Sequence, residues 1–331
     1  MHIPDGFLDL RTAVTTGVLS VSGLSLALRR LRYGLPRRRV PLMGLAAAFL
    51  FAAQMLNFPV AAGTSGHLLG AVLAAVLLGP SAAVVVVTAV LLVQTLLFAD
   101  GGVLALGANV FNMAILAVLA GYWVFRALER LLPGERGFLV AAAFASWWSI
   151  LVASIACAAE LSWSRVAPWG LVFPAMAGTH MVIGLGEALI TALVAAAILK
   201  TRPDLVEISG RAASGRTPRA TSAGRPSRLR LPAAFALVAT LGLLVFGVPF
   251  ASTRPDGLER VAEMLGFGVR ATASLVPAPM ADYHVPGFAS AAAATWAAAF
   301  VGTLVVFALA WAVAIALAPK SKQEAAPGAR T

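Results

Sequence analysis

Histidine occupies position 2, directly after the initiator methionine, and this pair of residues can chelate a metal ion. The α-amine of Met1, the deprotonated peptide nitrogen of His2 and Nδ1 of the His2 imidazole lie naturally in one plane. They close one five-membered and one six-membered chelate ring. A square of nitrogen ligands suits Ni²⁺ and Cu²⁺, whereas Zn²⁺ usually prefers a tetrahedron. The pair therefore predicts a metal site at the N-terminus, with one corner left for another ligand.

The first ten residues indicate that this terminus stays unblocked. The opening MHIPDGFLDL has no basic segment before an apolar core, so no secretory signal is expected. A bulky residue at position 2 also hinders removal of the initiator methionine. Pro4, Asp5 and Gly6 are turn-forming residues that can direct the terminus inward. Asp5 is interpreted either as an acceptor that orients a metal ligand or as the N-cap of the first helix.

His67 is the natural fourth ligand, because it lies in the Gly-rich loop Gly63-Thr64-Ser65-Gly66-His67 between two apolar spans. The topology derived below places this loop on the same side of the membrane as Met1. The alternative is that His67 merely begins a helix at the interface. Thr64 and Ser65 are expected to hydrogen-bond ligands or to cap that helix. Asn57, near the end of the preceding span, is expected to line a cavity or to bond between helices.

Two ionisable residues, His180 and Glu187, fall inside a later apolar run, seven positions apart on one helix face. Ionisable groups inside a membrane helix are costly, so they are candidates for function. They are interpreted either as part of a metal or proton path or as hydrogen-bonding groups between helices. Asn109 and Asn112 are their expected partners.

No catalytic or nucleotide-binding motif accompanies these residues. The sequence lacks GxxxxGK[ST], GxSxG, HExxH and CxxC patterns. Its single cysteine, Cys157, excludes a disulfide framework and a Cys-rich metal site. The chain is therefore predicted not to be an enzyme and not to bind nucleotide itself.

The elements that position these residues are membrane helices. Of the 331 residues, 60% are hydrophobic and 12% are charged, against about 45–50% and about 25% in soluble domains. About 20 apolar residues cross the hydrocarbon core. The predicted spans are 9–28, 40–57, 67–79, 81–98, 104–125, 138–159, 171–199, 231–250 and 288–318. The third is a half-length helix closed by Gly79-Pro80, although one broken helix over 67–98 is the alternative.

The basic residues favour an N-terminus outside the cell and a cytoplasmic C-terminus. With nine spans, twenty of the 25 Lys and Arg residues fall on the cytoplasmic side. The alternative of one broken helix over 67–98 would place the basic segments 29–39 and 200–230 on opposite sides of the membrane. The positive-inside rule therefore disfavours it. The net charge of +11 is thus a topology signal, and no nucleic-acid partner is expected. We predict an all-α polytopic helix bundle in the cell membrane, in contact with the lipid bilayer.

The spans divide into two modules. A metal-binding module of about seven spans is expected over 1–200, followed by a flexible basic cytoplasmic linker over 201–230. The second module, 231–318, has two spans and an outer loop, 251–287. A cytoplasmic tail, 319–331, completes the chain.

Three separated stretches, MHIPDGFLD, GTSGHLLGA (63–71) and GTHMVIGLGEALIT (178–191), resemble the substrate-binding permeases of cobalt and nickel energy-coupling-factor (ECF) ABC transporters, the CbiM/NikM family. Pro255-Asp256-Gly257-Leu258-Glu259 resembles the PDGLE signature of their small N-type companion subunit. The chain thus resembles a fusion of the two subunits.

The resemblance implies a seven-helix M module and a two-helix N module. It implies that the Met1 amine, the His2 amide and imidazole, and the His67 imidazole bind Ni²⁺ or Co²⁺ as transported substrate. It also implies partners, namely a transmembrane coupling protein (the T component) and two cytosolic ABC ATPases. The outer loop of the N module is expected to assist metal entry. Asp256, Glu259 and His284 are transient ligands there, or else Pro-Asp-Gly is a solvated turn that starts a helix.

The sequence therefore favours the metal-capture subunit of an ATP-driven importer. The alternative is a secondary Ni²⁺ or Co²⁺ permease driven by an ion gradient, which requires a relay of acids inside the membrane. Glu187 is the only acid deep in a predicted span. A membrane-bound enzyme of corrinoid synthesis is a further rival that lacks any supporting motif.

Overall fold

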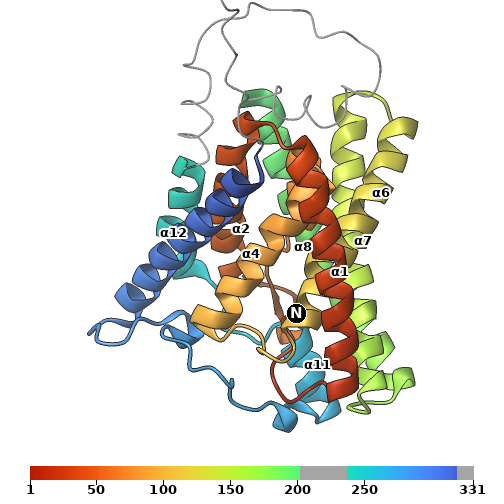
Figure 1. The fold of residues 1–331 in the computed structure, drawn as a ribbon. Helices are drawn as coiled ribbons and strands as arrows, with labels where there is room; N and C mark the ends of the chain where they lie inside the picture. The colour runs from red at the N-terminus through yellow and green to blue at the C-terminus, as the bar shows by residue number, and fades with distance from the viewer. Residues whose placement is uncertain (202–236, 319–331) are drawn as a thin grey trace, which may run out of the picture.

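The computed structural model describes residues 1–201 and 237–318, which are built almost entirely of helices (Figure 1). Six described helices are long and apolar enough to cross a membrane, and two shorter apolar helices, Val40–Met55 and Leu237–Phe250, accompany them. Large apolar side chains such as Val18, Leu185 and Phe246 face outward, as lipid-facing residues do. The predicted all-α membrane bundle is confirmed. The predicted linker, apart from Thr201, and the predicted tail lie outside the described residues.

The first 201 residues contain most of the helices. They are α1 (Leu10–Gly34), α2 (Val40–Met55), α3 (Ala71–Leu78), α4 (Pro80–Phe98), α5 (Leu106–Asn109), α6 (Ala117–Leu131), α7 (Gly134–Trp163) and α8 (Trp169–Thr201). A π-helical turn, Val110–Leu116, joins α5 to α6. Each predicted span in this region coincides with a helix, with its ends shifted by a few residues.

The break between α3 and α4 is where the sequence predicts it. Gly79 has φ +86°, a conformation that favours glycine, and Pro80 occupies the first position of α4. A half-length helix over this region is therefore confirmed. However, α3 begins at Ala71 rather than at His67, and Gly70 at its N-cap has φ +68°. His67 is thus not a helix-start residue.

The loop before α3 forms a short hairpin that the sequence does not predict. Strands β1 (Phe58–Pro59) and β2 (Ser65–Gly66) pair antiparallel, with Phe58 opposite Gly66. Gly66 is needed because a Cβ there would lie 2.5 Å from the side chain of Ile183 on α8. The hairpin thereby brings the residue after it, His67, against the bundle.

The second part of the chain contributes one further candidate membrane helix, a shorter apolar helix and the segment between them. A helix ending in a π-turn (Leu243–Gly247) and a 3-10 turn (Val248–Phe250) precedes α11 (Gly257–Leu265), and α12 (Ala291–Leu317) follows. Helix α12 packs on α2 and α4, where a Cβ at Gly302 would lie 2.2 Å from the ring of Phe51. Helix α11 packs on α8.

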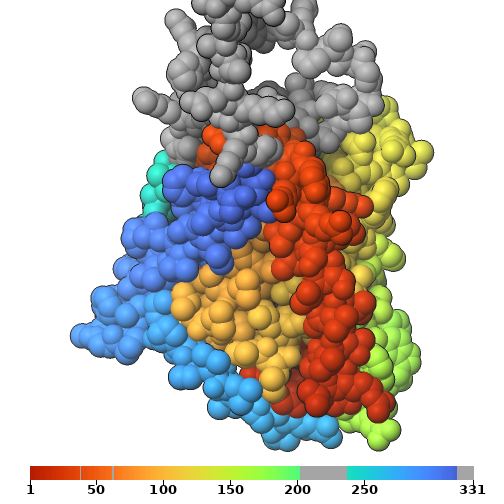
Figure 2. Space-filling model, viewed as in Figure 1, coloured from red at the N-terminus to blue at the C-terminus, as the bar shows by residue number. Residues whose placement is uncertain are grey.

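Segments from both ends of the chain meet at one end of the bundle. Figure 1 shows the N-terminus enclosed there beneath α4 and close to α11. In Figure 2 the residues that follow α11 wrap the rim of the same end. The loop that follows α11 is therefore positioned to cover the N-terminal residues.

Candidate metal centre

The N-terminal segment enters the bundle instead of extending into solvent. Met1 is 6% exposed and Ile3 is fully buried. Asn109, at the end of α5, accepts from Ile3 N at 2.8 Å and donates to Ile3 O at 3.1 Å. The N–H of Gly102 also donates to Ile3 O, at 2.8 Å. These bonds fix the backbone on the C-terminal side of the Met1-His2 pair.

Asp5 anchors the same segment but in neither of the predicted ways. Its carboxylate accepts from Val103 N at 3.1 Å and from Leu104 N at 2.8 Å. The N-cap of α1 is Asp9, whose side chain accepts from Thr12 N. A Cβ at Gly102 would lie 2.3 Å from Asp5, so glycine is required there. The predicted turn therefore directs the terminus inward by docking on the 102–104 loop.

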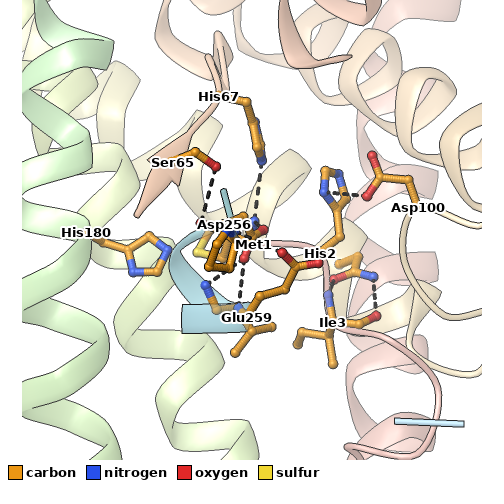
Figure 3. Close-up of polar contacts among 12 residues, drawn as sticks. Met1, His2, Ile3, Ser65, His67, Asp100, His180, Asp256 and Glu259 are labelled. Atoms are coloured by element: carbon orange, nitrogen blue, oxygen red, sulfur yellow. Dashed lines mark hydrogen bonds and ion pairs between the residues drawn. The ribbon is translucent and has the colours of Figure 1, made fainter. Parts of the chain in front are cut away.

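Met1, His2 and His67 meet at the buried end of this segment (Figure 3). The Met1 nitrogen lies 3.3 Å from Nε2 of His67, and the His2 and His67 rings stack with centroids 5.2 Å apart. One potential ligand atom each from His2, His67 and Asp256 lies within 4.8 Å of the others. The structure thus brings together the three residues on which the predicted site depends, and it adds a carboxylate.

The loop that carries His67 is bonded to α8, and a backbone oxygen of this loop contacts the far side of the imidazole. Its Nδ1 lies 3.3 Å from Leu68 O, which leaves Nε2 facing Met1. Glu187 accepts from Leu69 N at 2.6 Å and from Gly70 N at 2.8 Å. Gln54 donates to Leu69 O at 2.9 Å. Glu187 therefore positions the loop and does not contact the site.

The His2 ring is held by two residues that the sequence analysis does not select. Asp100 lies 3.0 Å from Nδ1, and Gln94 lies 3.2 Å from Nε2. Asp100 also accepts from the Tyr283 hydroxyl at 2.5 Å. A signal was present, since Gln94 is a polar residue inside an apolar span. Asp100 follows that span on the same side of the membrane as Met1.

Asp256 reaches the site from the second part of the chain. It caps α11, and its side chain also forms an ion pair with the Met1 ammonium. Asp256 N donates to the Glu259 carboxylate at 2.9 Å, which completes a capping box. Pro-Asp-Gly thus starts a helix as one prediction states. It is not a solvated turn, because Gly257 is buried and the Asp256 side chain is 14% exposed.

The site contains two imidazole rings with lowered pKa values and one ion pair between the Met1 ammonium and Asp256. Burial, with the nearby N-terminal charge, lowers the pKa of His67 to about 3, so its Nε2 lone pair is free at neutral pH. Burial also lowers the pKa of His2. Burial by itself lowers the pKa of the Met1 ammonium, but the Asp256 carboxylate raises it above its usual value. The ammonium in turn holds the pKa of Asp256 well below its usual range.

The remaining candidates lie outside this cluster or serve other roles. Ser65 donates its hydroxyl to Arg254 O at 2.7 Å, and the N-cap of α3 is Gly70, so neither Ser65 nor Thr64 caps that helix. Asn57 lines an apolar groove, and its backbone oxygen accepts from Ser252 N. His284 is exposed and lies 2.8 Å from Asp282 O.

The predicted asparagine partners of His180 and Glu187 are wrong. Asn109 bonds Ile3, as described above, and Asn112 donates to Glu160 Oε2 at 2.7 Å. Nδ1 of His180 lies 2.8 Å from Met176 O on its own helix. Asn112 and Glu160 form a buried polar pair between the π-helical turn and α7, which the sequence analysis does not anticipate.

The chemistry that this cluster supports is binding of a borderline divalent metal. An amine and two imidazoles are ligands that Ni²⁺, Co²⁺, Cu²⁺ and Zn²⁺ accept, and a carboxylate can balance the added charge. The cluster is buried beside a membrane bundle, with Asp100 and Asp256 partly exposed. It contains no paired acid and base around a substrate-sized cavity.

Comparisons with known proteins agree with this chemistry. Residues 2–205 match the family model of the cobalt uptake substrate-specific transmembrane region (CbiM), and residues 230–319 match the PDGLE domain. An Archaeoglobus fulgidus protein named as a fused nickel transport protein NikMN is 38% identical over 95% of this chain and 98% of its own length. The fused nickel transport protein NikMN of Rhodobacter capsulatus is 33% identical over 90% of this chain and 87% of its own.

Cobalt transport proteins and a solved structure extend the comparison. The cobalt transport protein CbiM of Geobacter sulfurreducens is 33% identical over 78% of this chain and 75% of its own. The crystal structure of a transition metal transporter, 35% identical, superposes with a TM-score of 0.57 over 64% of this chain and 99% of that one. This chain is a multi-pass membrane protein of the CbiM/NikM family of cobalt and nickel transport proteins, fused to a PDGLE domain.

Proposed function

We propose that this chain is the substrate-capture membrane subunit of an ECF-type ABC importer for Ni²⁺, Co²⁺ or both. The ion is bound by the Met1 amine, the amide nitrogen and Nδ1 of His2, and Nε2 of His67. The observation that carries the proposal is the distance of 3.3 Å between the buried Met1 nitrogen and His67 Nε2, with the His2 ring stacked alongside.

Ligation through Nδ1 of His2 requires that ring to turn. Nδ1 lies 3.0 Å from Asp100, so it exchanges this contact for the metal. The other ring nitrogen then donates to one of the two acceptors around it, Asp100 or Gln94, which fixes the ring. The fixed backbone at Ile3 keeps the peptide nitrogen of His2 in place while the ring moves.

The planar nitrogen set favours Ni²⁺, because a d⁸ ion is stabilised by a square of strong ligands. The relatives named above as fused M and N proteins are named for nickel, whereas the separate Geobacter sulfurreducens protein is named for cobalt. This chain shares the fused arrangement, which supports nickel as its substrate.

The energy for transport comes from partner subunits in this proposal. The sequence contains no P-loop, and the family resemblance implies a transmembrane coupling protein and two cytosolic ABC ATPases. The N-terminus and the metal site face outside, since twenty of the 25 basic residues then lie on the cytoplasmic side. Module one, 1–200, captures the ion, and module two, 231–318, covers the site through its outer loop, 251–287.

The proposal is tested by His2→Gln in the full-length protein. Glutamine is bulky enough to keep Met1 but has no imidazole, so the six-membered chelate ring cannot form and the purified protein should lose Ni²⁺ on a desalting column. The matched control is His284→Ala, which removes an exposed histidine on the same side. Stoichiometric Ni²⁺ in His2→Gln would contradict the proposed ligand set.

A further inference from the structure

The outer segment of the PDGLE domain is docked on the loops around the proposed metal site by backbone hydrogen bonds. Ser252 N donates to Asn57 O at 2.7 Å, and Ser65 N donates to Pro255 O at 2.8 Å. Farther along, Thr272 N donates to Asp5 O at 2.9 Å. The start of α11 lies between these anchors and is therefore held in a defined position against the CbiM region.

At this position α11 closely approaches His180 on α8. A Cβ at Gly257 would lie 2.7 Å from Nε2 of His180 and 2.7 Å from Ile183. Glycine at the first position of α11 thus allows the helix to approach the imidazole. The seam, meaning the contact between α11 of the PDGLE region and α8 of the CbiM region, therefore has Asp256 on the α11 side and His180 on the α8 side.

The imidazole of His180 has the arrangement of a metal ligand. Its side chain is 2% exposed, and Nδ1 lies 2.8 Å from Met176 O, which requires a proton on Nδ1. The Nε2 lone pair is then available, and it has no hydrogen-bond partner among the described residues. Histidines that bind metals typically donate one ring N–H to a carbonyl and present the other nitrogen to the ion.

A small cavity of about 10 Å³ lies between this imidazole and the proposed capture site. Met1, His67, His180 and Asp256 contribute to its wall, together with the thioether residue Met113. This volume matches about one water-sized particle. Figure 3 shows the His180 ring directed toward Asp256 and Met1. The remaining wall is apolar or glycine, so the titratable and sulfur groups converge on one spot.

We propose that Nε2 of His180 and the carboxylate of Asp256 form a second position for the divalent ion, which the ion occupies on its way from outside to the capture site. The inference rests on the proposed function, because the ion it passes on is the one that Met1, His2 and His67 retain. The PDGLE domain thereby supplies a ligand for loading the metal into its partner region.

The ligand types explain the direction of transfer. Asp256 is the more exposed of the two ligands, at 14%. Its carboxylate oxygen can replace a water molecule of the hydrated ion. The imidazole behind it draws the ion into the seam, and the planar nitrogen set then binds it more tightly. Two divalent ions this close repel strongly in a buried site, so the two positions are occupied in sequence.

The test measures Ni²⁺ loading of the full-length protein by stopped flow, using a chromophoric chelator to report free Ni²⁺. His180→Leu removes the ligand, and Gly257→Ala leaves it in place but puts a methyl group against its free nitrogen. We expect both to load roughly tenfold more slowly or worse, with the equilibrium dissociation constant within about threefold of the unmodified value. The matched controls are His284→Leu and Gly268→Ala, where an added Cβ meets no atom closer than 3.9 Å.

A second measurement isolates the seam position. His2→Gln removes the chelating imidazole, so equilibrium dialysis of this variant should detect one weakly bound Ni²⁺ that disappears when His180→Leu is added. Loading of both seam variants at the unmodified rate would overturn the inference. So would a parallel loss of rate and affinity in His180→Leu, because the residue would then serve the capture site itself. Failure of the proposed function is recognised separately, by stoichiometric Ni²⁺ retention in His2→Gln on the desalting column.

Discussion

The Met1 amine has two neighbours of opposite character, an imidazole that can share a metal with it and a carboxylate that holds its proton. His67 Nε2 lies 3.3 Å away, and Asp256 forms an ion pair with the ammonium. Both neighbours come from segments far from residue 1 in the sequence. At the scale of single residues, the proposed metal binding is therefore an exchange in which the ion replaces protons on nitrogen.

Replacing His67 by alanine should weaken Ni²⁺ binding without abolishing it. The amine, the amide and the His2 ring remain as a three-point chelate. We expect the dissociation constant to rise about 100-fold, equivalent to about 2.7 kcal/mol. Isothermal titration of the purified protein measures this change, with His284→Ala as the control. An unchanged constant would remove His67 from the ligand set.

The affinity for Ni²⁺ should rise with pH between 6 and 8. The Asp256 carboxylate raises the pKa of the Met1 ammonium despite burial, so the amine carries a proton in this range and must release it. The His2 amide releases a second proton, whereas His67, with a pKa of about 3, releases none. Two protons released give up to about 100-fold per pH unit. Dissociation constants measured at pH 6, 7 and 8 check the slope, and a flat profile would exclude amide ligation.

At the scale of elements, the start of α3 depends on a carboxylate from α8. Helix α3 has no side-chain cap, and Gly70 and Leu69 donate instead to Glu187. The loop that carries His67 immediately precedes these two residues. Glu187 therefore links the longest helix of the bundle to the position of a proposed metal ligand.

Glu187→Gln should destabilise this loop and weaken metal binding together. A carboxamide offers one oxygen, so one of the two backbone N–H groups faces an NH₂ group and is left unsatisfied. Such a buried donor costs about 1–3 kcal/mol. We expect a lower thermal unfolding midpoint and a higher Ni²⁺ dissociation constant. Glu135→Gln, at the exposed start of α7, is the control. Equal midpoints for the two variants would refute this role.

At the scale of the whole molecule, the fused PDGLE domain places the segment between its two helices over the N-terminus of the CbiM region. The rim seen in Figure 2 is made by residues that follow α11. Glu187, the candidate for a gradient-driven relay, is engaged by two backbone donors. Glu187 thus anchors a loop in this structure, as the proposed capture subunit requires of it.

Uptake of Ni²⁺ by cells that express this chain should require the co-expressed coupling protein and ATPases. An inactivating substitution in the P-loop of the ATPases should reduce the accumulation of radioactive Ni²⁺ to the level of cells that do not express this chain. Dissipating the proton gradient while ATP is maintained should leave uptake unchanged. The reverse pattern would favour the secondary permease.

The sequence by itself determined the membrane helices, the break at Gly79-Pro80 and the residues of the proposed chelate. These features depend on local properties: apolar run length, the backbone preferences of glycine and proline, and the adjacency of Met1 and His2. Contact between His67 and Met1 was predictable because the topology places both on one side.

Only the tertiary structure decided which residues surround that chelate. Asp256 is 255 positions from Met1, and although the PDGLE resemblance offers it as a transient ligand, no local pattern places it against the Met1 ammonium. Asn109 bonds the N-terminal segment rather than His180, since the packing of α5 against the terminus sets its partner. Local patterns specify elements, whereas side-chain contacts between distant segments depend on how those elements pack in three dimensions.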